Sequence, residues 1–494
     1  MSVCVGSGTR QVSVPGDGTP RLFIGGEWVD ATGSTTVTSV DPATGEPIID
    51  VPVARPDEVA AAVGAAKDAQ RAWASATPGR RAEALVALAE RLREMSGDLV
   101  RTEAIDAGMP VGVARFDLER CLDSLRSNAA LADEVKGTTF IDAPESLLYS
   151  LRQPYGVVGV VNPFNHPLLF AVTKAAPALA TGNTVVIKAP SAAPLTTLLV
   201  AEASRGILPP GVLNVVTGSA TTGEALVGDP RVGKISFTGS AATGAQIMAM
   251  AARNITPVLL ELGGKNASII LPDMSVDRAV AGAVAGMSLK TCGQSCQSST
   301  RAFVHRSLHD EFIEKLRAAL ARVAVGDPLD ERTAMGPIIS ERQLQTVRRY
   351  VQSGLDEGAQ LVAGGGRPAL PDGFEGGYYL QPTVFASVRP EMAIAREEIF
   401  GPVLSVFAWD DLDATIETMN SSPYGLTASI WTDRLDAHAI AARLEAGNVF
   451  VNRHGPAIRH MPFGGWKQSG IGTSHGLWEM AEFTRHKSVW LRLA

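Results

Sequence analysis

The chain has 494 residues, 45% of them hydrophobic and 19% charged, and is therefore long enough for several packed domains. Its formal net charge of −7 gives nucleic acid no bulk attraction, and no apolar run approaches the ~18 to 20 residues that span a bilayer. Its 4 cysteines are too few for a disulfide framework, and none is spaced with histidine as in a zinc site. These features argue against a nucleic-acid, membrane or metal-binding role and favour a cytoplasmic enzyme.

The first 150 residues read as a short extended segment followed by helices. Residues 22–51 form short runs broken by turn residues, which predicts an edge hairpin. Residues 58–73 and 81–95 carry apolar side chains at intervals of three and four, which predicts amphipathic helices. A third helix is expected over residues 111–135.

After residue 150, short β-branched runs alternate with helical stretches such as 168–180 and 195–205. The strand-like runs are 157–161, 184–187, 212–216, 234–237 and 257–261. This alternation predicts βαβ units and a parallel sheet, and its repetition over residues 276–443 indicates a second α/β domain. Ligands bind at the carboxyl ends of such strands, so the residues just after each run are the candidate site.

Two strand ends carry residues that suit catalysis. Residues 162–167 (NPFNHP) follow the first run, and their prolines would hold the Asn165 amide rigidly enough to meet an oxyanion. Glu261 ends the last run beside two glycines that leave room for water, as a general base requires. The alternatives are an asparagine that closes a turn and a strand-end carboxylate paired with Lys265.

A cysteine supplies the candidate nucleophile. Cys296 ends a turn of small residues, 293–296 (GQSC), where backbone amides can stabilise a thiolate and a substrate can come close. By itself this signal is weak, because most cysteines in such a chain are buried, reduced thiols. We expect that ordinary role for Cys4 and Cys121, and it is an equal alternative for Cys292.

Two further motifs complete a specific set. They are residues 396–403 (REEIFGPV) and 462–470 (PFGGWKQSG). Together with the three motifs above, in this order, they resemble the aldehyde dehydrogenase superfamily over nearly the whole chain. The resemblance implies an NAD(P)-dependent enzyme that oxidises a small-molecule aldehyde to a carboxylic acid without a metal.

The resemblance assigns the catalytic roles residue by residue. Cys296 matches the nucleophile and Glu261 the base that activates the hydrolytic water. Asn165, with the Cys296 backbone amide, matches the oxyanion hole. Lys174 matches the lysine that some members place in a proton relay behind the base. The acid that often partners this relay is replaced here by Arg485, so the relay lacks its usual partner.

The resemblance also implies a site for NAD or NADP. The matching residues are Lys188, Ser191, Phe237, Gly239, Ser240, Gly244, Leu262, Glu398 and Phe400. The glycine turn would present amides to the pyrophosphate, and Glu398 would hold the nicotinamide ribose. Strict NAD users carry an acid where this chain has Ser191, and serine does not repel a 2′-phosphate, so we expect NADP to be tolerated.

The substrate cavity departs from that of members that oxidise apolar aldehydes. This chain has His166, Thr173 and Lys290 where they have aromatic residues, and the loop near the C-terminus adds Arg459 before Phe463. A cationic, less aromatic cavity favours a polar or carboxylate-bearing aldehyde. The alternative is that Lys290 and Arg459 face solvent or ion-pair partners.

The implied fold is α/β, with a Rossmann-like cofactor-binding domain, an α/β catalytic domain and a small bridging β-extension. The expected bounds are residues 21–137 with 153–262 for the first, 263–460 for the second, and 138–152 with 477–494 for the extension. Such an extension is stable only against a neighbour, so we expect a homodimer or homotetramer.

Two other functions remain as alternatives. A CoA-acylating semialdehyde dehydrogenase would transfer the acyl group to a thiol, but that subclass usually lacks the base that Glu261 would provide. A catalytically silent binding or structural protein on the same fold is the second. The presence of both Cys296 and Glu261 argues against it.

Overall fold

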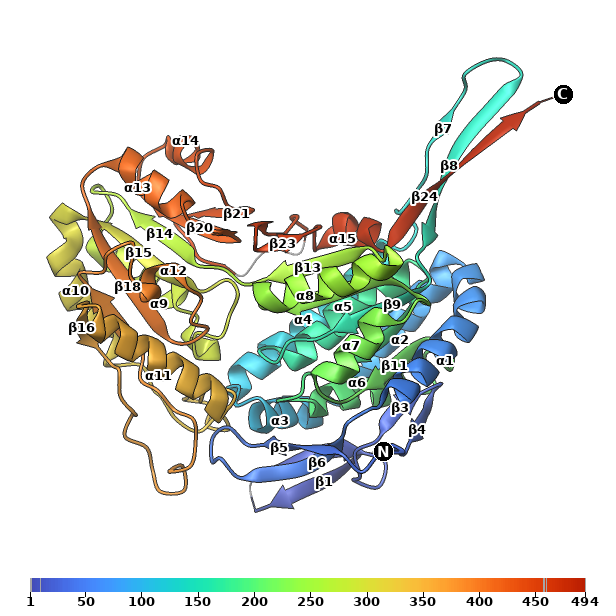
Figure 1. The fold of residues 1–494 in the computed structure, drawn as a ribbon, viewed down its shortest axis with the longest axis horizontal. Helices are drawn as coiled ribbons and strands as arrows, with labels where there is room; N and C mark the ends of the chain where they lie inside the picture. The colour runs from blue at the N-terminus through green and yellow to red at the C-terminus, as the bar shows by residue number, and fades with distance from the viewer. Residues whose placement is uncertain (1, 9, 456–457, 459, 494) are drawn as a thin grey trace.

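The computed structural model describes residues 2–8, 10–455, 458 and 460–493. In this part of the chain two large sheets form two lobes, and a narrow arm projects from the first lobe (Figure 1). No helix in the described ranges is long and apolar enough to cross a membrane. The α/β class expected from the sequence is confirmed.

The first lobe contains a sheet of eight strands in the order β23-β13-β12-β9-β10-β11-β3-β4. Its five central strands run parallel: β9 (Val157–Val161), β10 (Thr184–Lys188), β11 (Leu213–Val216), β12 (Val232–Gly239) and β13 (Val258–Leu262). The edges are antiparallel: β3 (Leu22–Ile24) and β4 (Glu27–Val29) on one side, β23 (Gly470–Ile471) on the other. The predicted strands and edge hairpin are therefore present.

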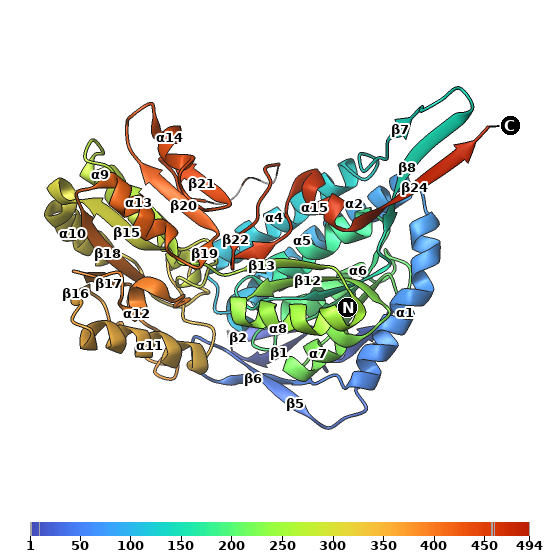
Figure 2. The same ribbon diagram turned by 45° about the horizontal axis from the view of Figure 1, so that its top comes forward.

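Helices cover both faces of this sheet (Figure 2). One layer holds α1 (Pro56–Ser75), α7 (Ala220–Gly228) and α8 (Ala241–Ala251); the other holds α2 (Pro78–Glu94), α4 (Val111–Ala130), α5 (Pro167–Ala180) and α6 (Leu195–Ser204). Alternate strand residues enter the two layers, so Val157 packs in the first and Val158 in the second. This period of two explains why the buried strands read as continuous apolar runs.

One helix of this lobe was not predicted. It is α3 (Ser96–Asp106), which lies between the second and third predicted helices. Its residues from Thr102 to Asp106 are all buried, polar and apolar alike, so no amphipathic stripe marks it in the sequence. Glu103 and Asp106 become helix caps instead, because their carboxylates accept hydrogen bonds from Leu168 N at 3.2 Å and Leu195 N at 2.8 Å.

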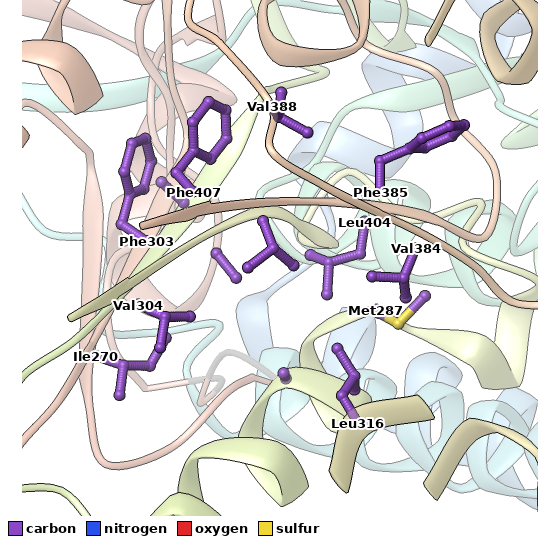
Figure 3. Packing of buried hydrophobic residues seen from close by; sticks show 14 of the residues in the cluster. Ile270, Met287, Phe303, Val304, Leu316, Val384, Phe385, Val388, Leu404 and Phe407 are labelled. Atoms are coloured by element: carbon purple, nitrogen blue, oxygen red, sulfur yellow. The ribbon is translucent and has the colours of Figure 1, made fainter. Parts of the chain in front are cut away.

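The second lobe is built on a sheet of seven strands in the order β16-β17-β18-β15-β14-β20-β21. These are β14 (Asn266–Ile270), β15 (Ser299–His305), β16 (Gln360–Ala363), β17 (Thr383–Ala386), β18 (Val403–Trp409), β20 (Thr427–Trp431) and β21 (Asn448–Val451), parallel except for β16. Its helices are α9 (Val276–Gly286), α10 (Arg306–Leu320), α11 (Glu341–Asp356), α12 (Ala393–Arg396), α13 (Leu412–Asn420) and α14 (Ala437–Ala441). Its core includes Phe303 and Phe407, whose rings stack at 4.5 Å (Figure 3).

Two N-terminal hairpins lie against the lobes. They are β1 (Ser2–Ser7) with β2 (Arg10–Pro15), and β5 (Thr36–Val40) with β6 (Pro47–Pro52). Arg10 forms ion pairs with Asp41 near the second hairpin and, at 2.9 Å, with Asp327 in the loop after α10. One guanidinium therefore ties the N-terminal segment to the second lobe.

The arm consists of β7 (Thr139–Phe140), β8 (Ser146–Pro154) and β24 (Thr484–Arg492), close to where the sequence predicts bridging strands. β8 and β24 pair antiparallel along their whole lengths, and α15 (Gly476–Glu482) lies at the base of the arm (Figure 1). The remaining short elements are η1 (Ala252–Asn254), η2 (Leu289–Thr291), β19 (Tyr424–Gly425) and β22 (Trp466–Lys467).

Candidate active site

A cavity of about 390 Å³ brings the four predicted catalytic residues together. Asn165 precedes α5, Lys174 lies within α5, Glu261 is near the end of β13, and Cys296 belongs to the turn before β15. These residues come from both lobes and are up to 131 positions apart in the chain. The parallel strands end at a common edge, which is why loops so distant in sequence meet here.

The turn that carries Cys296 is held rigidly. A Cβ on Gly293 would lie 2.3 Å from the Gly401 carbonyl, so only glycine allows the turn to approach that loop. Asn266 Nδ2 donates hydrogen bonds to the carbonyl oxygens of Cys296 at 2.6 Å and Ser298 at 2.9 Å. Sequence analysis missed Asn266, whose signal is a polar residue that opens an otherwise apolar buried strand.

In the isolated chain, the surroundings of Cys296 disfavour the charged thiolate form of its side chain. Burial, together with the nearby carboxylates of Glu261 and Glu398, raises the pKa of Cys296 to about 12, although Lys174 opposes them. The sulfur is therefore protonated at neutral pH. Any nucleophilic role requires the proton to leave as the sulfur reacts.

Glu261 has the properties of a base that works near neutral pH. Burial raises the pKa of Glu261 to about 7, while Lys174 and a hydrogen bond with Ser474 lower it. Its Oε1 is buried and accepts no hydrogen bond from the described residues. A carboxylate with an open acceptor at the wall of a cavity can bind and polarise a water molecule.

Lys174 has an acidic partner, contrary to the expectation from Arg485. Lys174 Nζ donates to Glu479 Oε1 at 2.9 Å and to Ser474 Oγ at 2.7 Å. Burial alone would lower the pKa of Lys174, but the charges of Glu479 and Glu261 raise it. The acidic partner, Glu479, comes from α15. Arg485 instead lies over the Tyr155 ring at 5.8 Å. No local pattern in the sequence distinguishes position 479 as the partner of Lys174.

Asn165 lies against the cysteine turn. Its Nδ2 donates to the Gln294 carbonyl at 2.9 Å, and Gln294 is in turn fixed by a 3.1 Å hydrogen bond from Ile339 N to its Oε1. The Asn165 side chain is buried, and its Oδ1 has no hydrogen-bond partner among the described residues. The amide is thus held next to Cys296, where a donor to an oxyanion is required.

A second cavity, of about 630 Å³, lies beside the first sheet and receives residues from both lobes. Lys188 and Ser191 line it, with Thr243 from α8 and Arg342 from α11. Lys188 Nζ donates to Ser191 Oγ at 3.0 Å, and the Ser191 hydroxyl donates to the Gly218 carbonyl at 2.6 Å. Burial lowers the pKa of Lys188 to about 8, so an anion near it would favour its charged form.

The start of α8 forms a narrow cradle next to this cavity. Ser240 caps the helix by accepting a hydrogen bond from Thr243 N at 3.3 Å. A Cβ on Gly239 would lie 2.3 Å from the Phe237 ring, and one on Gly244 would lie 2.7 Å from Leu262. These contacts explain the two glycines and leave backbone amides at a helix N-terminus, an arrangement that suits a phosphate.

The residues predicted to lie at the nicotinamide and its ribose, Phe400 and Glu398, come from the second lobe, between α12 and β18. Glu398 accepts a hydrogen bond from Gly264 N at 3.1 Å, and a Cβ on Gly263 would overlap its carboxylate. Burial raises the pKa of Glu398 to about 7. Phe400 adopts a left-handed backbone (φ 55°), and its ring meets Phe164 edge-on at 5.7 Å. No cluster in the described ranges has three His, Cys, Asp or Glu side chains arranged to hold a metal ion.

The predicted substrate residues are only partly brought together. His166, Thr173 and Phe463 line the 390 Å³ cavity. Lys290 does not: it is exposed on η2, a turn flanked by left-handed residues, and it lines a small separate cavity with Asn165. Arg459 lies outside the described residues. Sequence analysis missed Arg120 on α4, which lines the 390 Å³ cavity. Arg453, in the loop before Phe463, lines it as well.

Comparisons with known proteins agree with this geometry. The family model described as "Aldehyde dehydrogenase family" matches residues 28–489. An aldehyde dehydrogenase from Bacillus cereus has a TM-score of 0.93 and 37% identity, covering 96% of this chain and 97% of that chain, and it has also been solved as an NAD+ complex. PnpE from Pseudomonas sp. WBC-3 has a TM-score of 0.93 and 35% identity, and the match covers 96% of this chain and 98% of PnpE. Betaine aldehyde dehydrogenase from Staphylococcus aureus has a TM-score of 0.93 and 33% identity, and the match covers 96% of this chain and 95% of that chain.

The buried pair of Lys174 and Glu479 predicts a pH-dependent loss of stability. Lys174→Met leaves a buried carboxylate without its cation, which costs about 3 kcal/mol when that carboxylate is charged. Lys174 holds the pKa of Glu479 below its usual value; without it, burial raises that pKa, and the penalty shrinks as falling pH protonates the group. The drop in Tm relative to wild type, measured by calorimetry, should be larger at pH 8 than at pH 5.

The double variant Lys174→Met with Glu479→Gln is the control. It removes both charges and should recover more than half of the lost stability at pH 8. An equal drop in Tm at both pH values would show that packing, and not the ion pair, is what the lysine contributes.

Proposed function

The chain belongs to the aldehyde dehydrogenase family, and we propose that it oxidises a polar aldehyde to the carboxylic acid through a thioester on Cys296. One observation carries the proposal: a single cavity is lined by a thiol, by the Asn165 amide and by a carboxylate whose pKa is about 7. These are the nucleophile, oxyanion donor and base that acyl transfer to water requires.

The first half of the reaction forms the acyl-enzyme. Cys296 Sγ bonds to the carbonyl carbon, the thiol proton passes to water in the cavity, and the carbonyl oxygen gains negative charge. Asn165 Nδ2 and the Cys296 backbone N–H are the donors for that oxygen. A bound nicotinamide dinucleotide supplies the acceptor for the hydride that leaves the same carbon. The carbon–sulfur bond remains, as a thioester.

The second half releases the acid. Glu261 takes a proton from a water molecule, and the resulting hydroxide adds to the thioester carbon. Asn165 again holds the oxyanion until the carbon–sulfur bond breaks, and the departing Cys296 sulfur takes the proton that Glu261 gained, which restores the thiol and the carboxylate. Lys174, which donates to Ser474 and Glu479, keeps its charge and opposes the effect of burial on Glu261.

The residues near the second cavity fit NAD or NADP. Support comes from the amides at the start of α8, from the cradle that Gly239, Gly244 and Gly263 keep open, and from the Glu398 carboxylate, which can accept ribose hydroxyls. Lys188 would bind near the adenosine ribose. PnpE and the Bacillus cereus enzyme have both been solved with NAD+.

Replacing Glu261 by Gln tests the mechanism. Glutamine is nearly the same size but cannot accept the proton from water, so the acyl-enzyme should form and then persist. Stopped-flow kinetics with saturating cofactor should show one rapid equivalent of NADH followed by a turnover at least about 100-fold slower than wild type. Mass spectrometry of the quenched protein should locate the acyl group on Cys296.

Two results would contradict this mechanism. A first turnover slowed as much as the steady state would mean that Glu261 activates the thiol. An adduct on any side chain other than Cys296, or full activity of Cys296→Ser, would refute the proposed intermediate. Acyl-CoA formed on addition of CoA would favour the CoA-acylating alternative.

Ser191 predicts that NADP+ binds. Ser191→Glu puts a carboxylate beside Lys188, which should raise the Kd for NADP+ at least about 10-fold through repulsion of the 2′-phosphate and leave NAD+ within about 3-fold. Titration calorimetry gives both constants directly. Ser191→Ala is the matched control, since it removes the hydroxyl without adding charge. A wild-type protein that fails to bind NADP+ would refute the prediction.

The arm supports assembly into a homodimer or homotetramer. It exposes apolar side chains that the monomer does not cover, among them Trp490 at 78%, Ile141 at 71% and Phe140 at 63%. Trp490→Lys should therefore lower the oligomeric state in sedimentation velocity runs at micromolar concentration. Leu435→Lys, at a position 95% exposed but far from the arm, should leave it unchanged. A monomeric wild-type protein would overturn the proposal.

A further inference from the structure

The wall of the catalytic cavity formed by α4 is mostly polar between two apolar ends. Arg120, Ser124, Ser127 and Asn128 line the cavity at spacings of four, three and one, so they share one face of the helix. Asp123 lies on the same wall, and Phe116 and Leu131 lie at its two ends. Thr173 extends this wall from α5. An alkyl chain placed against it would displace water from these groups and offer no hydrogen bonds in return, which is unfavourable for each group left unpaired.

Behind this wall lies a buried carboxylate that holds two of its members. The Asp117 side chain is 1% exposed; its Oδ2 pairs with His166 Nδ1, and its Oδ1 accepts from Arg120 Nη1 at 3.4 Å. The Arg120 guanidinium also lies over the Phe116 ring at 5.9 Å. Both His166 and Arg120 line the cavity, so one buried acid positions two cavity-facing side chains.

His166 directly follows Asn165, the proposed oxyanion donor, so it stands where the substituent of a bound aldehyde begins. With Nδ1 engaged by Asp117, Nε2 is the ring atom that remains for a ligand, and it donates to a carboxylate when the ring carries both protons. Arg120 lies on the facing helix, and a guanidinium has five N–H donors, so it can contact Asp117 and a ligand together. From another wall, Arg453 adds a second guanidinium, over the Phe450 ring at 6.0 Å.

Resting on the proposed aldehyde oxidation, we infer that the substrate carries a carboxylate, which Arg120 and His166 bind while Asp117 positions both. A carboxylate forms charge-assisted, potentially bidentate hydrogen bonds with a guanidinium such as that of the half-buried Arg120. The buried Asp117 supplies the opposite charge that lets a cation remain at this wall when no substrate is bound. Arg120 and His166 are specificity-determining residues, and Asp117 is a positioning residue.

The test compares aldehydes with the same number of carbon atoms, with and without the carboxylate charge. The pairs are 4-oxobutanoate with butanal, 5-oxopentanoate with pentanal, and 4-carboxybenzaldehyde with 4-methylbenzaldehyde, with 4-hydroxybutanal as a neutral polar arm. We expect at least one carboxylated member to exceed its partner and the hydroxyaldehyde about 10-fold or more in kcat/KM, mainly through KM. A preference for the uncharged aldehyde in every pair, or for 4-hydroxybutanal over the carboxylated aldehydes, would overturn the inference.

Variants assign the effect to these residues. Arg120→Gln should reduce the ratio of kcat/KM for carboxylated over uncharged aldehyde by about 10- to 100-fold. Asp117→Asn should raise KM for the carboxylated aldehyde more than it changes kcat, a split that a general loss of structure would not produce. Arg126→Gln is the control: it lies on the same helix, but its guanidinium bonds to Glu90 and does not line the cavity. A ratio unchanged in Arg120→Gln, or reduced equally in Arg126→Gln, would refute the assignment.

The same assays distinguish a failure of the carboxylate inference from a failure of the proposed function. If butanal or 4-methylbenzaldehyde is oxidised while the carboxylated partners are not preferred, aldehyde oxidation stands and the carboxylate inference falls. If no aldehyde of either kind reduces NAD+ or NADP+ with the wild-type protein, the proposed function itself falls, and the inference with it.

Discussion

The arrangement of the site depends on one buried cation. Lys174 lies among three carboxyl and thiol groups that burial pushes toward their neutral forms, and its charge is what opposes that tendency in Glu261, Glu479 and Cys296. Glu479 in turn keeps Lys174 charged in an environment that would otherwise neutralise it. The pair therefore acts on the protonation state of the proposed base, Glu261, and of the proposed nucleophile, Cys296. This is a reason to retain a buried ion pair whose net contribution to stability is small.

Rigidity at the turn of Cys296 comes from hydrogen bonds and close packing and not from regular structure. Cys296 sits in a turn, but Asn266 from β14 holds its carbonyl, Gln294 is fixed by Ile339, and Gly293 lets the turn lie against Gly401. Asn165 joins this network through Gln294. Side chains held on several sides keep their positions to within the few tenths of an ångström that acyl transfer demands.

The catalytic cavity has two zones, one at the Cys296 sulfur and one along the α4 wall. The inner end is built from groups that any aldehyde would meet, whereas the α4 wall adds hydroxyl, amide, guanidinium and carboxylate groups between Phe116 and Leu131. Asp117 links the two zones, because it orients His166 beside the oxyanion donor and Arg120 farther along the wall. The proposed oxyanion donor, Asn165, and the proposed specificity residue, His166, are thus neighbours at the N-terminus of α5.

The sequence by itself determined the fold class and the parallel strands, because these depend on local patterns such as apolar runs bounded by turns. It proposed Cys296, Glu261 and Asn165 as the catalytic groups through a set of short motifs that is specific only when taken together. It could not determine that Glu479 partners Lys174 where residue 485 is not an acid, that Lys290 does not line the catalytic cavity, or that Asp117 stands behind Arg120 and His166. Those facts depend on which helices pack side by side, since α15 reaches α5 and α4 reaches the start of α5 only after the chain has folded. Helix α3 escaped prediction for a related reason: its acids are buried as caps for other helices, which only tertiary contacts make favourable.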